Sequence, residues 1–91
     1  MVAAAETTVQ IKSPLGLNLH AAVTLAQVAE KFAAHIVIQS GKNQANAKSV
    51  MDLITLEAGQ GSMLHISTEG DDAVDAIATL RVLFERRLGP K

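Results

Sequence analysis

The periodicity of the chain changes across the stretch Pro14-Leu15-Gly16-Leu17-Asn18-Leu19-His20-Ala21-Ala22. Before this stretch, residues 6–12 alternate between two faces, as is typical of a half-buried strand. After it, residues 18–33 repeat small and apolar side chains at every third or fourth position, which predicts an amphipathic helix of about four turns. Proline and glycine can turn the chain between the two elements. We therefore expect a strand, a turn and a helix in that order.

The remaining sequence predicts a hairpin, a short helix, a strand and a long helix. Residues 35–40 are rich in β-branched side chains, and a turn at residues 40–43 separates them from a weaker strand at residues 44–47. Residues 49–56 begin like a helix with a capping box, formed by Ser49 and Asp52. Residues 62–68 alternate again, and the helix that begins near Gly70 carries an apolar stripe of Ala73, Ile77, Leu80, Phe84 and Leu88. The order β-α-β-β-α-β-α predicts an α+β domain, in which helices pack on one face of an antiparallel sheet.

The composition restricts the class of protein. A chain of 91 residues fits one domain, for which we expect a loose segment at residues 1–5 and a folded unit at residues 6–89. The net charge of −1 and the presence of only two aromatic side chains argue against nucleic-acid binding. Cysteine is absent, which excludes thiol catalysis and disulfides. Neither a secretion signal nor a membrane-spanning run is apparent, so we expect a cytoplasmic protein that does not insert into a membrane.

Two segments at the starts of the predicted helices resemble those of the HPr family. These are Gly16-Leu17 before the first helix and Asn46-Ala47-Lys48-Ser49-Val50-Met51 before the second; Gly59–Gly61 and Glu69-Gly70-Asp71 also match, so the resemblance runs from Glu6 to Leu88. HPr proteins are the histidine-containing phosphocarriers of the bacterial phosphoenolpyruvate:sugar phosphotransferase system. The resemblance implies an open-faced β-sandwich of four antiparallel strands covered on one face by three helices. It also implies a role in sugar transport and carbon catabolite regulation, as a phosphoryl carrier without a cofactor rather than a self-contained enzyme.

The segment that carries the chemistry of the family departs from the family pattern. The family motif is Gly-Leu-His-(Ala/Thr)-Arg-Pro-Ala, and this chain has Asn18 where the phosphoacceptor histidine stands and His20 where the arginine stands. Asparagine is among the best helix N-caps, worth about 1 kcal/mol over alanine. Its amide does not supply the labile phosphoramidate that HPr uses. The substitution resembles that of Crh, an HPr paralogue with glutamine in place of the histidine, and predicts a regulatory protein-binding module.

His20 leaves a second hypothesis open. It lies about two positions into the first helix, where free backbone amides favour an anion. An active phosphocarrier could accept the phosphoryl group of Enzyme I on His20 and pass it to an enzyme II component such as enzyme IIA. A shift of two helical residues, however, turns a side chain by about 200° away from the family position.

Further candidate residues are implied by the same resemblance. Ser49 matches the serine that a dedicated HPr kinase phosphorylates in Gram-positive relatives, and a phosphate there would face free helix amides. Leu19, Val50 and Met51 fall where the family has the apolar face on which partner proteins dock, and Leu19 replaces a small residue there. One or two of the three could instead be buried. His35 and His65 fall on strands without a second ligand at metal spacing, so we expect no metal site.

Overall fold

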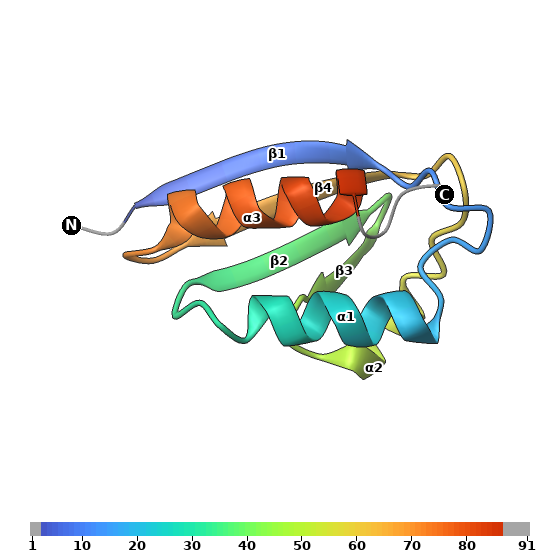
Figure 1. Cartoon of the computed structure of the whole chain (residues 1–91), viewed down its shortest axis with the longest axis horizontal. Helices are drawn as coiled ribbons and strands as arrows, with labels where there is room; N and C mark the ends of the chain where they lie inside the picture. Colours follow the sequence, from blue (N-terminus) through green and yellow to red (C-terminus); the bar gives the residue numbers. More distant parts are fainter. Residues whose placement is uncertain (1–2, 87–91) are drawn as a thin grey trace.

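The computed structural model describes residues 3–86, which form four strands and three helices (Figure 1). The elements are, in chain order, β1 (Ala4–Gln10), α1 (Leu19–Ala29), β2 (His35–Ser40), β3 (Asn43–Asn46), α2 (Val50–Thr55), β4 (Met63–Glu69) and α3 (Ala73–Arg86). The strands form one antiparallel sheet in the order β1-β4-β2-β3. The predicted α+β fold, with its β-α-β-β-α-β-α order, is confirmed.

The strand register places the apolar side chains of the sheet against the helices. Val9 pairs with Leu64, and Ile38 pairs with Ile66, so the two central strands and β1 bury the same face. Leucines from each helix complete the core, namely Leu25, Leu53 and Leu80, all fully buried. Burial of this apolar area is the main term that stabilises the fold. On the last helix, Ala73, Leu80 and Phe84 are buried as predicted, whereas Ile77 is half-buried.

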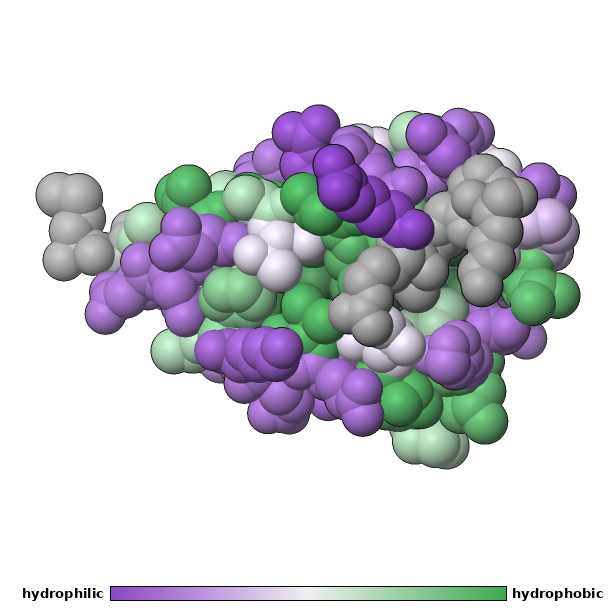
Figure 2. Space-filling view, in the orientation of Figure 1, coloured by the Kyte–Doolittle hydropathy of each residue, from purple (hydrophilic) through white to green (hydrophobic). Residues whose placement is uncertain are grey.

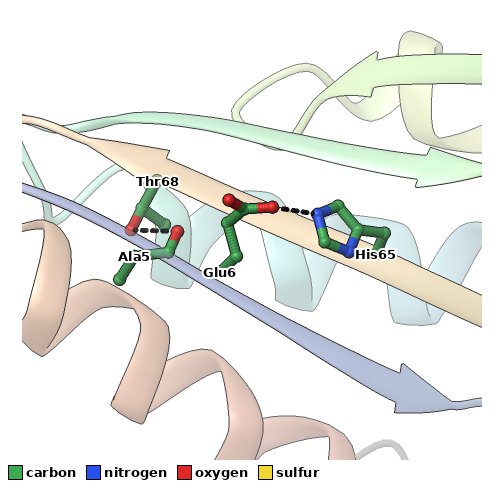
Figure 3. Close-up of polar contacts among 4 residues, drawn as sticks. All are labelled: Ala5, Glu6, His65 and Thr68. Atoms are coloured by element: carbon green, nitrogen blue, oxygen red, sulfur yellow. Dashed lines mark hydrogen bonds and ion pairs between the residues drawn. The ribbon is translucent and has the colours of Figure 1, made fainter.

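β1 keeps the predicted length of seven residues but lies two residues earlier than the sequence predicts, and it ends at Gln10 instead of residue 12. It begins at Ala4, because Ala4 and Ala5 pair with Glu69 and Thr68 across the sheet. The buried Thr68 hydroxyl lies 3.3 Å from the Ala5 carbonyl oxygen (Figure 3) and 2.8 Å from that of Ala73. Ala4 and Ala5 therefore do not belong to the loose segment expected at residues 1–5. Leu88 and the expected domain end at residue 89 lie outside the described residues.

α1 is shorter than predicted and ends at Ala29 instead of Ala33. The backbone amides of Ala33 and Ala34 turn away to the Asp72 carboxylate, at donor–acceptor distances of 2.9 and 2.8 Å. The hydrogen bond from the Ala33 amide is the main cause that holds the pKa of Asp72 below its ordinary value. The Ala34 amide and the charge of Lys48 contribute less. The helix ends early because a side chain distant in sequence satisfies the amides that follow it.

Candidate functional site

The backbone before α1 is held against the segment that follows α2. Gly16 has a φ of +65°, and a Cβ atom there would lie 2.7 Å from the Ala58 carbonyl oxygen. The next amide, that of Leu17, donates to the same oxygen at 2.9 Å, and the Leu17 side chain is buried. Only glycine fits this close approach without strain. Residues 16 and 17 thus fix the position from which α1 begins.

Asn18 caps α1, as the sequence predicts. Its backbone is extended, and its Oδ1 atom accepts from the Ala21 amide at 2.9 Å. Its carbonyl oxygen accepts from the Ala22 amide at 2.9 Å and begins the helical ladder. One of the unpaired amides of the first turn is thereby satisfied by the side chain.

His20 is exposed in the first turn of α1. Its carbonyl oxygen accepts a hydrogen bond from the Thr24 hydroxyl at 3.1 Å. Asn18 precedes the helix with an extended backbone, whereas His20 is the second residue of α1. The two side chains therefore leave the chain from different backbone conformations, although both lie at the start of the helix.

Ser49 caps α2 in the same manner as Asn18 caps α1. The Ser49 Oγ atom accepts from the Asp52 amide at 3.3 Å. The capping box is incomplete, however, because the Ser49 amide already donates to the Asn46 carbonyl oxygen at 2.9 Å. The Asp52 carboxylate accepts from the Asn46 amide instead, at 3.3 Å. The prediction is therefore correct for Ser49 and wrong for the reciprocal bond of Asp52.

The structure places the two caps at opposite ends of α1. Lys48, next to Ser49, donates from its Nζ atom to the carbonyl oxygen of Phe32, just beyond the end of α1, at 2.6 Å. Asn18 lies at the other end of this helix of 11 residues, whose length is about 16 Å. Ser49 and Asn18 consequently form two separate sites.

An exposed apolar patch surrounds the start of α1 and the outer side of α2. Four residues form this patch, which we call the apolar patch: Leu15, Leu19, Met51 and Ile54, which are 75%, 62%, 72% and 37% exposed. The loop before α1 contacts the segment directly after α2, and α1 packs against α2, so these residues belong to one region of the molecule. Figure 2 shows hydrophobic surface at this end.

The patch agrees only partly with the expected docking residues. Leu19 and Met51 are exposed as expected, but Val50 packs against the core. Leu15 and Ile54 were not anticipated. Ile54 follows Met51 by three residues, a spacing that puts both on one face of a helix, so the sequence contained a signal for it. Leu15, between a proline and a glycine in a turn, gave no comparable signal.

At the end of this segment, Glu57 adopts an unusual backbone conformation. It is the only described residue other than glycine with a positive φ, at +51°. It directly follows the C-cap of α2, where a left-handed residue commonly ends a helix, usually glycine. Glu57 directly precedes Ala58, whose carbonyl oxygen accepts from the Leu17 amide and lies close to Gly16.

The other two histidines take no part in either cap. His65 Nε2 lies 2.6 Å from Glu6 Oε1 on the face of the sheet opposite the helices (Figure 3), and His35 is exposed on β2. Within residues 3–86, no three His, Cys, Asp or Glu side chains cluster as metal ligands would. None of the described helices has the length and apolar character to span a membrane.

Comparison with known proteins identifies the family. Residues 5–86 match the sequence family described as "PTS HPr component phosphorylation site". The chain is 35% identical to the HPr-like protein Crh of Halalkalibacterium halodurans over 89% of this chain and 96% of that protein. It is 32% identical to the phosphocarrier protein HPr of Xylella fastidiosa over 90% of this chain and 92% of that protein.

The fold gives the same result. The crystal structure of HPr-C-His from Thermoanaerobacter tengcongensis superposes with a TM-score of 0.90 at 36% identity, covering 96% of this chain and 98% of that one. The relatives thus include both a Crh protein and phosphocarriers. The chain belongs to the HPr family of the phosphotransferase system.

Proposed function

We propose that this chain is a regulatory docking protein of the phosphotransferase system that lacks the usual phosphoacceptor. The single observation that carries this proposal is the state of Asn18. It stands where the family motif has its histidine, and its Oδ1 atom is engaged with the Ala21 amide at 2.9 Å. The position retains the helix cap, but an amide side chain provides no ring nitrogen to accept a phosphoryl group.

The apolar patch provides the surface for docking. Leu15, Leu19 and Met51 are each more than half exposed, near the loop that Leu17 ties to the Ala58 carbonyl oxygen. Exposed apolar groups that gather in one place on a small protein indicate an interaction site, and methionine adapts to partners of different shape. The partners in this proposal are phosphotransferase proteins that normally dock with HPr, such as Enzyme I or an enzyme IIA.

A competition experiment tests the docking function. An excess of this protein should slow phosphoryl transfer from Enzyme I to an ordinary HPr, because both would occupy the same surface of Enzyme I. A Leu19→Ser, Met51→Ser double variant should lose most of the inhibition. Val74→Ser is the matched control, since Val74 is also exposed, at 60%, but lies on α3. Inhibition that persists in the double variant, or is absent from the unaltered protein, contradicts docking through the patch.

Ser49 is proposed as the site of control. A phosphate on this residue would lie at the start of α2, where the helix amides favour an anion. The Asp52 carboxylate in the same turn opposes it, so the net effect on α2 is a balance of the two. Incubation with HPr serine kinase and ATP should give acid-stable phosphate that is lost in Ser49→Ala. Labelling that survives this substitution would place the modification elsewhere.

Phosphoryl transfer through His20 is the second candidate function. The observation that favours it is the exposure of His20 in the first turn of a helix. This function predicts acid-labile phosphate from Enzyme I on the protein itself, which docking alone does not. The two functions are therefore separated by direct phosphorylation, independently of the competition experiment.

A further inference from the structure

A groove on the opposite side of α1 from α2 has no role in the proposed function. It lies between the second half of α1 and α3, has a volume of about 270 Å³, and is floored by Val28, Phe32, Val82 and Leu83. Leu83 is buried, but Val82 is 51% exposed, and Val28 and Phe32 are only partly buried. Figure 2 looks onto this side and shows hydrophobic surface between the two helices, with hydrophilic surface on either side.

Two cations border the apolar floor. Lys31 lies at the end of the groove near the C-terminus of α1, and Arg86 is the last described residue of α3. The two helices run in opposite directions in Figure 1, so the cations mark different ends of the groove. The groove-lining part of α3, from Thr79 to Arg86, is about 10 Å long.

These cations are not neutralised by described carboxylates. Among residues 3–86 the ion pairs are His65–Glu6 and Arg81–Glu85, so neither Lys31 nor Arg86 takes part in one. None of the residues that line the groove is acidic. The groove therefore combines an apolar floor with positive charge at its ends, although the chain as a whole carries a net charge of −1.

We propose that the groove between α1 and α3 docks an acidic amphipathic helix of a second protein. An apolar helix face laid between two helices is a common mode of peptide recognition. Glutamates or aspartates about two turns apart on that helix would meet Lys31 and Arg86, while leucine-like side chains between them cover Val82 and Phe32. The small size of the groove limits the contact to a weak and reversible one. The protein would then hold two partners on separate surfaces.

A charge-reversal titration tests this proposal on the full-length protein. The probe is a capped helical peptide of about 15 residues, with leucines along one face and glutamates beside them, and the control peptide has lysines in place of the glutamates. Amide shifts of the 15N-labelled protein are followed by NMR. The acidic peptide should shift residues 28–32 and 79–86 and bind about tenfold more tightly than the basic peptide.

Variants at the exposed cations make the test reciprocal. Lys31→Glu with Arg86→Glu should invert the preference between the two peptides, and circular dichroism verifies that the variant is folded. A Lys12→Glu, Lys42→Glu variant has the same charge change outside the groove and should keep the original preference. Equal binding of both peptides, no shifts, or shifts confined to the apolar patch overturn the proposal. It is likewise overturned if residues 87–91 occupy the groove, so that shifts appear only in a variant ending at Arg86.

Discussion

α1 and α2 begin with the same local structure and differ in what surrounds it. Both N-caps have an extended backbone and a side-chain oxygen that accepts from the third following amide, at 2.9 Å for Asn18 and 3.3 Å for Ser49. The first turn of α1 contains no acidic residue, whereas that of α2 contains Asp52, and the apolar patch reaches both starts, through Leu19 on α1 and Met51 on α2. The start of α2 lies between the charged groups of Lys48 and Asp52.

The difference shows that a cap specifies where a helix begins but not what the site does. At Asn18 the neighbours are apolar and the cap atom is an amide oxygen, which suits a surface for protein contact. At Ser49 the cap atom is a hydroxyl oxygen, and charged groups lie beside it. We propose that the first region binds a partner and that the second regulates the protein.

The largest expected loss of stability is at Gly16, in the segment that holds the start of α1. Gly16→Ala should lower the free energy of unfolding by about 2–3 kcal/mol, because the new Cβ would clash with Ala58 at 2.7 Å in addition to the cost of a positive φ. The matched control is Gly41→Ala, since Gly41 has a similar φ of +59° and nothing within 4 Å, and should cost about 1 kcal/mol. Urea unfolding measures both. Equal losses would show that the contact with Ala58 does not support the start of α1.

The two caps themselves come next. Asn18→Ala should cost about 1–2 kcal/mol of unfolding free energy and Ser49→Ala about 0.5–1 kcal/mol, since the bond of Asn18 is shorter. Asn18→Asp and Ser49→Thr keep a capping oxygen and should each cost less than about 0.5 kcal/mol. Denaturant titration of the four variants makes the comparison. A larger loss at Ser49 than at Asn18 would reverse the assigned ranking of the caps.

A substitution at Glu57, in the segment that holds the start of α1, is expected to increase the stability of the protein. Glu57→Gly should raise the free energy of unfolding by about 0.5–1 kcal/mol, because glycine adopts a φ of +51° without the steric cost of a side chain. Glu57→Ala retains that cost and serves as the control, with little change expected. Thermal and urea unfolding would detect the gain. A loss of stability in Glu57→Gly would mean that the Glu57 side chain makes a contact that outweighs the strain.

The smallest expected effect is the pH dependence of stability that Asp72 contributes at the end of α1 nearer Ser49. The pKa of Asp72 in the folded protein is lowered, chiefly by the Ala33 amide, from an ordinary value of 3.8. A lowered folded-state pKa stabilises the protein above the unfolded-state value, and this contribution is lost as the pH falls through the folded-state pKa. Stability should therefore decrease below about pH 4 more steeply in the unaltered protein than in Asp72→Asn. Parallel pH curves for the two proteins would contradict the role of this carboxylate.

Local pattern was sufficient for most of the fold. Each strand and helix packs on the core through its apolar face. This face appears in the sequence as the alternation of residues 6–12 and 62–68 and as the helical spacing around Leu25 and Leu80. The end of α1 could not be predicted in this way, because it depends on Asp72, which is 38 residues away from Ala34 in sequence. A pattern within one segment contains no information about such a partner.

The site was predicted to a similar extent. Both caps follow from residue type and position, so Asn18 and Ser49 were found from sequence. The exposure of Leu15 and the burial of Leu17 depend instead on how the loop packs on Ala58, which no local rule describes. The separation of the two caps by the length of α1 likewise required the tertiary arrangement.

The most direct test of the central claim is phosphorylation by phosphoenolpyruvate and Enzyme I. We expect no acid-labile phosphate on the unaltered protein, and labelling in an Asn18→His, His20→Arg double variant that restores the family residues at both positions. An ordinary HPr serves as the positive control for Enzyme I. Acid-labile phosphate on the unaltered protein that disappears in His20→Gln would contradict a protein without a phosphoacceptor and establish His20 as that residue.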